Sequence, residues 1–182
     1  MHCAGIAPDT GPASAYPVLM TAPAIQPFIL QPGETVDHLP LHVLGEIIHM
    51  KVTGAQTAGR YSIAEEIAPP GGGPPLHVHR NEDEWFYILE GAFTFQVGEQ
   101  LLNVTPGTAL FGPRGVPHTF ANTGTTPGRM IIVFEPAGFE HFFAKMADAC
   151  RNGMPAPSVI EPIFEDFGMR VLGPPILQRQ SA

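Results

Sequence analysis

Short apolar segments separated by turns make up most of the chain from residue 41 onward. Within these segments apolar residues tend to alternate with polar ones, the period expected of strands that bury one face. Glycine and proline interrupt the pattern about every 8–12 residues, which is typical of an antiparallel sandwich or barrel. We therefore predict an all-β domain with strands at residues 41–52, 61–67, 76–79, 84–89, 93–97, 100–104, 108–111, 117–122 and 129–135.

Glycine and proline also define the expected connections between the first strands. Gly45 interrupts the segment 41–52 and predicts a β-bulge there. This segment and the segment 61–67 are separated by a turn, which predicts a hairpin. Residues 69–75, with the sequence PPGGGPP, can continue neither a helix nor a strand, so we expect a loop.

The pattern changes to a helical period after the last expected strand. Apolar side chains there recur at i, i+3, i+4 and i+7, which predicts an amphipathic helix over residues 138–151. Ser158 and Glu161 have the spacing of a capping box and predict a second helix that ends near Phe167. We expect these helices to cover an open end or an edge of the barrel, and the remaining tail to be extended.

Residues 1–37 are rich in proline, alanine, glycine and threonine and show no sustained period. This composition predicts an extended N-terminal arm, which we expect to pack along the domain between Ile25 and Leu30. The chain is thus predicted to consist of an arm at residues 1–37, a β-barrel at residues 38–136, and a helical extension with its tail at residues 137–182.

The size and composition of the chain agree with one globular domain. Its 182 residues, 44% of them hydrophobic, suffice for one sizeable core. The formal charge is −8, and the basic residues are scattered, which excludes an electrostatic site for nucleic acid or an anionic membrane. The sequence has no apolar run of membrane-spanning length and no signal peptide at its start, so we predict a cytoplasmic protein.

Histidines and carboxylates gather in PPLHVHRNEDEWFYILEG, residues 74–91. Side chains at i and i+2 of a strand project from the same face, so His77 and His79 point together. The strand that returns after the next turn brings Glu84 within reach of the same interior. Each of these residues taken singly is better explained as a surface group of a polar loop.

His118 lies far along the chain, between two turn-rich segments, and supplies a fourth candidate ligand. Three neutral imidazoles and one carboxylate suit one divalent ion of Fe, Ni, Co, Cu, Mn or Zn, and leave positions free for water or substrate. Four such residues at these spacings favour metal binding over a solvated loop. Glu82 and Asp83 are expected to face solvent in the turn, and His49 ranks second as a candidate.

Three phenylalanines are candidates for the wall of a substrate pocket. Phe86 shares the strand face of Glu84, Phe120 shares that of His118, and Phe134 lies in the last expected strand. Each is also explained as core, because the core residues nearest an ion inside a barrel line any pocket as well. The pattern leaves these two roles open.

Two motifs in this region resemble those of the cupin superfamily and match them in every spacing. The first comprises Gly71, His77, His79, Glu84 and Gly91. The second comprises Gly107, Pro113, Gly115, His118 and Asn122. The resemblance extends over about residues 41–135 and implies a double-stranded β-helix, or jelly-roll barrel, that binds a metal ion through both motifs.

The layout is similar to that of bacterial single-domain quercetin 2,3-dioxygenases, in its proline-rich arm, its WFYILEG segment and its phenylalanine-rich helix after the barrel. This resemblance implies a flavonol bound to the metal through its 3-hydroxyl beside O2, followed by ring cleavage that releases carbon monoxide and a depside. A bound divalent ion lowers the pKa of a hydroxyl, and Glu84 is the candidate both for ligand and for catalytic base.

Other functions of the same fold stay open, because cupins also include isomerases, decarboxylases, regulators and storage proteins. The alternative enzyme is another metal-dependent oxygenase, a cyclase or an isomerase that acts on an aromatic biosynthetic intermediate. The alternative from another class is a non-catalytic cupin that binds a metal or a small molecule. The arm and the edge strand at residues 41–52 predict a homodimer formed by β-augmentation.

Overall fold

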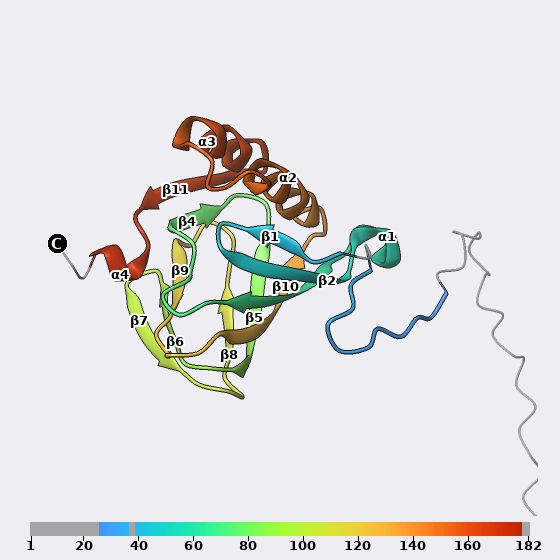
Figure 1. Ribbon diagram of the computed structural model, residues 1–182, viewed down its shortest axis with the longest axis horizontal. Coiled ribbons are helices and arrows are strands. Elements are labelled where there is room, and N and C mark those ends of the chain that lie inside the picture. Colours follow the sequence, from blue (N-terminus) through green and yellow to red (C-terminus); the bar gives the residue numbers. More distant parts are fainter. Residues whose placement is uncertain (1–25, 37–38, 180–182) are drawn as a thin grey trace, which may run out of the picture.

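The computed structural model describes residues 26–36 and 39–179 (Figure 1). The strands are β1 (Leu41–Val43), β2 (Glu46–Val52), β3 (Ser62–Ala68), β4 (Leu76–His79), β5 (Asp83–Glu90), β6 (Phe93–Val97), β7 (Gln100–Val104), β8 (Ala109–Gly112), β9 (His118–Asn122), β10 (Gly128–Glu135) and β11 (Met169–Gly173). The helices are α1 (Gly54–Thr57), α2 (Glu140–Cys150), α3 (Pro157–Asp166) and α4 (Ile176–Arg179). Within the described ranges, no helix has the length and apolar character needed to cross a membrane.

Two antiparallel sheets curve around a common interior (Figure 1). One has the strand order β1-β2-β3-β10-β5-β8, and the other has the order β11-β4-β9-β6-β7. The strands are short and the turns between them are rich in glycine, as the spacing of turn residues predicted. The all-β fold with C-terminal helices is therefore confirmed.

The strand register explains which side chains enter the interior. Across the larger sheet, Ala64 of β3 pairs with Ile132 of β10, and Ile132 pairs in turn with Phe86 of β5. All three side chains are buried, whereas Trp85 and Tyr87 on the other face of β5 are partly exposed. The two-residue period of the sequence thus assigns the faces of β5 correctly.

Helices α2 and α3 lie together over one end of the barrel, beside β1, β4 and β11 in Figure 1. The buried face of α2 carries Phe142, Phe143 and Met146, as its helical period predicted. Phe139, which directly precedes α2, stacks on Phe134 of β10 with the ring centroids 4.7 Å apart. These aromatic side chains close this end of the barrel.

The first expected strand is divided in the structure. Leu44 and Gly45 form a turn with φ angles of 51° and 96°, and β1 pairs with β2 across it. The prediction of a bulge at Gly45 is therefore wrong, because two consecutive residues with positive φ make a tight hairpin turn.

Two predictions near the C-terminus also differ from the structure. Helix α3 begins after Ala156, and no side chain caps it, so the capping box of Ser158 and Glu161 is wrong. The expected extended tail contains the strand β11, which pairs with β4, but its described part also includes the helix α4, which was not expected. The sequence did not predict this strand, because apolar and polar residues do not alternate strictly along it.

The described part of the N-terminal arm attaches to the barrel later than expected. Phe28 is 46% exposed and Ile29 is 84% exposed, so packing of this segment along the domain is wrong. In the described part of the arm, the Glu34 carbonyl accepts a hydrogen bond from Nζ of Lys51 in β2 at 2.8 Å, and the Val36 N–H donates to the Met50 carbonyl at 2.9 Å. Residues 1–25 lie outside the described residues, and the three-part division of the chain stays a prediction.

Gly73 is the position in the loop before β4 where a side chain is least tolerable. Its φ is +155°, and a Cβ there would lie 2.0 Å from the carbonyl oxygen of Phe120. Since backbone atoms have no rotamer with which to move aside, we expect Gly73→Ala to lower the free energy of unfolding by more than about 3 kcal/mol. Urea unfolding measures this, with Gly173→Ala as the control because its Cβ would meet its nearest neighbour at 3.9 Å. Equal stability of the two variants would contradict the expectation.

Candidate metal centre

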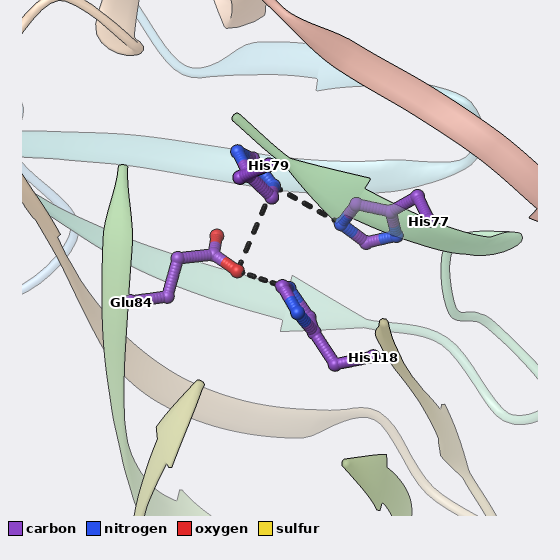
Figure 2. Close-up of side chains that lie close together, drawn as sticks. All are labelled: His77, His79, Glu84 and His118. Carbon is purple, nitrogen blue, oxygen red and sulfur yellow. Dashed lines mark hydrogen bonds and ion pairs between the residues drawn. The ribbon is translucent and has the colours of Figure 1, made fainter. Parts of the chain in front are cut away.

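Four side chains from three strands meet inside the barrel (Figure 2). His77 and His79 come from β4, Glu84 from β5 and His118 from β9. One donor atom of each lies within 4.8 Å of the others, and all four residues are buried. The pairing of β4 with β9 sets His77 directly opposite His118. The structure thus brings together all four residues that the sequence selected as ligands.

Hydrogen bonds on the far side of the rings orient two of the imidazoles. Nδ1 of His77 lies 2.8 Å from the carbonyl oxygen of Pro75, and Nδ1 of His118 lies 3.0 Å from that of Val116. A carbonyl oxygen only accepts, so Nδ1 carries a proton in both rings. Nε2 is then the atom that each ring directs toward the centre, with a free lone pair whenever the ring is neutral.

Glu82 orients the third imidazole, and the prediction that it faces solvent is wrong. Glu82 is 7% exposed, and its Oε2 lies 3.2 Å from Nδ1 of His79. A carboxylate in this place holds His79 in the same tautomer as His77. The Nε2 atoms of His77 and His79 therefore face each other at 3.1 Å with no proton required between them. A cation bound by both nitrogens would stabilise this arrangement.

The charges within the cluster complement one another. Burial alone raises the pKa of Glu84, but the neighbouring His79 and His118 outweigh it and lower that pKa to about 2. Burial lowers the pKa of His118, and the Glu84 carboxylate, which is hydrogen-bonded to its Nε2, overcomes this and raises it. Burial and the two other histidines lower the pKa of His77 to about 3. The cluster therefore contains a carboxylate and at least one neutral imidazole at neutral pH.

The donor set fits a divalent transition metal. Neutral imidazole nitrogens and one carboxylate suit Fe, Ni, Co, Cu, Mn and Zn alike. A metal ion would replace the proton that His118 shares with Glu84, since metal ligands must be deprotonated. His77, His79, Glu84 and His118 are thus the residues that would hold the ion.

The cluster opens onto a cavity of about 70 Å³, which has room for a few water molecules. Phe86, Phe120 and Phe134, the three pocket candidates, all line this cavity. Its other wall comes from the C-terminal helices and the residue before them, and includes Phe139, Phe142, Phe143 and Phe164. The helical period predicted the burial of Phe139, Phe142 and Phe143, but only the path of the chain shows that they face the same cavity as the cluster.

Two further carboxyl groups line the cavity and were missed by the sequence analysis. They are Glu46 of β2 and Glu66 of β3, which are 8% and 4% exposed. The two-residue period of a strand places Glu46 on the same face as the buried Ile48, and Glu66 on the same face as the buried Ala64. The sequence analysis did not predict their burial, because carboxylates are rarely buried.

The matching family description agrees with this geometry. The family described as "Cupin domain" matches residues 64–134, a segment that contains all four side chains of the cluster. Residues 64–134 form a cupin domain. The cupin resemblance seen in the two sequence motifs is confirmed, and the cupin domain runs from within β3 to within β10.

Several known proteins are similar to parts of the chain. Quercetin 2,3-dioxygenase of Bacillus subtilis is 30% identical over 124 residues, which are 67% of this chain and 35% of that enzyme. An uncharacterized protein of Methanocaldococcus jannaschii is 27% identical over 112 residues, which are 62% of this chain and 81% of that protein. The solved structure of KdgF from Halomonas sp. superposes with a TM-score of 0.52 at 18% identity, covering 58% of this chain and 92% of KdgF. The similarity to KdgF concerns the cupin fold alone.

The remaining candidates of the sequence analysis lie away from the cluster. His49 is on the opposite face of β2, with Nδ1 3.7 Å from Glu65, so it does not join the cupin ligands. Asp83 is partly exposed and forms an ion pair with Arg114 at 2.8 Å. The hydrogen bonds from Arg114 lower the pKa of Asp83 to about 2.

We expect Glu82→Gln to weaken metal binding by about 10–100-fold, because an amide orients and polarises His79 less well than a carboxylate does. Isothermal titration of the metal-free protein with Zn²⁺ measures the affinity. The matched control is Asp83→Asn, which removes the neighbouring carboxylate on the side of Arg114. Equal affinities of the two variants would show that Glu82 does not act on the cluster.

The stability of the metal-free protein should fall as the pH rises above 6.5. Burial raises the pKa of Glu46 to about 8 in the folded protein, from 4.5, although a hydrogen bond with Glu66 opposes this. Between pH 6.5 and 8 the unfolded chain has lost this proton and the folded protein retains it, so folding loses about 2 kcal/mol across this window. The raised pKa values of Glu66 and His118 act in the same direction.

Urea unfolding at pH 6.5 and pH 8 measures this loss. The double variant Glu46→Gln with Glu66→Gln cannot titrate at either carboxyl and should retain most of its stability at pH 8, with only the slope from His118 left. An identical loss in the wild-type protein and in the double variant would contradict the assignment to this carboxyl pair.

Proposed function

We propose that the protein is a metal-dependent dioxygenase that cleaves a flavonol-like aromatic substrate. The observation that carries the proposal is the position of the His–Glu cluster at the wall of a cavity lined by phenylalanines. The similarity to quercetin 2,3-dioxygenase of Bacillus subtilis supports it. Because this chain spans about a third of that enzyme's length, the substrate is proposed and is not carried over from it.

Each part of the cavity has a task in this reaction. When bound, a divalent metal ion lowers the pKa of a coordinated substrate hydroxyl and supports the chemistry of O2. Glu84 would receive the proton of that hydroxyl on Oε2, the atom that now bonds to His118. Phe86 and Phe120 would stack on a planar ring and exclude water from the anion that results.

The cavity must enlarge to admit such a substrate. Its volume is about 70 Å³, whereas pockets for drug-sized ligands typically measure about 300–1,000 Å³. The side of the cavity formed by Phe139, Phe142 and Phe164 belongs to the helical extension, which is joined to the barrel by aromatic contacts with Phe134. Rotation of these rings or a shift of α2 and α3 would open the barrel end.

Reconstitution tests the proposal. The metal-free protein is loaded separately with Ni, Co, Mn, Fe and Cu, mixed with quercetin, and followed by loss of flavonol absorbance together with oxygen uptake. We expect at least one metal to give turnover, with one O2 consumed and one carbon monoxide released for each flavonol. No turnover with any of these metals would contradict the proposed dioxygenase.

A non-catalytic cupin that binds a metal and a small molecule is the second candidate, and the small cavity favours it. A ligand of a few heavy atoms fits 70 Å³ without any movement of the helices. The two candidates differ in the same assay, because the second predicts retained metal with no oxygen uptake.

The homodimer and the cytoplasmic location stay predictions. The strand β1 lies at the edge of its sheet and is the strand on which two copies would pair.

A further inference from the structure

We propose that the carboxyl pair of Glu46 and Glu66 is the recognition site for hydroxyl groups at the end of the substrate that does not bind the metal. The inference rests on the proposed function and deepens it, because it specifies a polyhydroxylated aromatic compound as the substrate class. Nothing in the cupin ligand motifs involves either residue.

The first observation is the placement of the pair. Glu46 begins β2 and Glu66 lies on β3, in the larger sheet, whereas the histidines of the cluster lie on β4 and β9 of the other sheet. Both carboxyl groups and the cluster line one cavity. A molecule bound at the cluster therefore has the pair within the same enclosure, on strands that do not supply a ligand.

The second observation is an incomplete set of hydrogen bonds. The side chains of Glu46 and Glu66 are hydrogen-bonded to each other, and Oε1 of each is buried with no partner besides that bond among the described residues. Both residues are more than nine-tenths buried. A carboxyl group can form several hydrogen bonds, so a buried pair that lines a cavity with only its mutual bond keeps bonding capacity that a ligand can complete.

The chemistry of the cavity identifies that ligand. A hydroxyl group can donate to a carboxylate oxygen and accept from a protonated carboxyl, so it suits a pair that shares a proton. Burial and the neighbouring carboxylates of Glu46 and Glu84 raise the pKa of Glu66, which agrees with such sharing. An anionic group would be repelled by Glu84 and by the pair. Because the remaining lining is largely aromatic, the hydroxyls are expected on an aromatic ring.

A purely structural role predicts different behaviour. Buried charged or polar groups are often replaced by apolar side chains of similar volume without loss of stability. If the pair only filled space, Glu46→Met with Glu66→Met would bind every ligand as the wild-type protein does. If the pair recognises hydroxyls, the same double variant loses affinity only for ligands that carry them.

The test compares two flavonols on the full-length protein loaded with Zn²⁺, under argon so that no turnover occurs. Quercetin carries ring hydroxyls besides the 3-hydroxyl, and 3-hydroxyflavone carries the 3-hydroxyl alone. Titration calorimetry gives both dissociation constants for the wild-type protein, for the double methionine variant and for Glu46→Gln with Glu66→Gln. Elemental analysis checks that each protein retains its zinc.

We expect the double methionine variant to bind quercetin about tenfold or more weakly, the loss typical of hydrogen bonds to a charged partner, while 3-hydroxyflavone changes by less than about threefold. The double glutamine variant should lie between the two proteins, because amides still form hydrogen bonds. If the methionine variant fails to fold, the glutamine variant carries the test, with an expected loss of about threefold for quercetin alone.

An unchanged ratio of the two dissociation constants in the variants would overturn the role of the pair and leave the proposed function standing. Failure of the wild-type protein to bind either flavonol would instead overturn the proposed function, and the inference with it.

Discussion

Replacing His118 by alanine is expected to leave the purified protein without stoichiometric metal and without flavonol turnover. His118 is the only ligand from β9, and its Nε2 contacts Glu84 directly. Its loss removes one of four donors and leaves the Glu84 carboxylate buried without its principal partner. Loss of a residue that only orients a metal ligand lowers metal affinity by up to about 100-fold. Loss of a ligand itself should therefore lower it by more than about 100-fold.

Elemental analysis after dialysis against excess metal measures the first effect, and flavonol consumption measures the second. The matched control is His141→Ala, which removes an exposed histidine from α2 and should change neither quantity. Full metal content in His118→Ala would contradict the assignment of this residue as a ligand. Circular dichroism establishes that the variant is folded before either result is used.

Replacing Glu84 by glutamine should separate the two roles proposed for this carboxylate. An amide oxygen can still bind a metal weakly, but glutamine cannot accept the substrate's proton at neutral pH. We expect kcat, expressed per bound metal, to fall by about 10²–10⁴-fold, the contribution typical of a positioned general base. Metal affinity should fall as well, yet the three histidines should still bind metal at high concentration.

The comparison is made at saturating metal with the variant Glu90→Gln as control, since Glu90 lies on the same strand and forms an exposed ion pair with Arg129. Retention of wild-type kcat per metal in Glu84→Gln would show that another group takes the proton. In that case Glu66 is the next carboxyl to replace, because it lines the same cavity.

Strand periodicity was sufficient to predict the all-β fold and the inward face of β5. The parity that directs Glu84 and Phe86 inward also leaves Trp85 on the outer face, as the structure confirms. The prediction that His118 lies beside the other three residues came from the spacing of the two motifs. The residues of a single segment do not determine which distant strand it pairs with.

Features that depend on the path of the chain were not predictable in this way. Glu82 was predicted to face solvent because a carboxylate in a turn is usually exposed. In the structure it instead contacts Nδ1 of His79. β11 was missed since its pairing with β4 depends on where α3 ends. The burial of Glu46 and Glu66 ran against their charge, and only the path of the chain shows that both line the cavity beside the cluster.

The most direct test of a metal centre at the four side chains is anomalous diffraction from crystals of the protein loaded with Co²⁺ or Zn²⁺. The account predicts one anomalous peak per chain, about 2.0–2.3 Å from Nε2 of His77, His79 and His118 and from a Glu84 oxygen. A peak elsewhere in the molecule, or a metal bound with His118 out of reach, would contradict it.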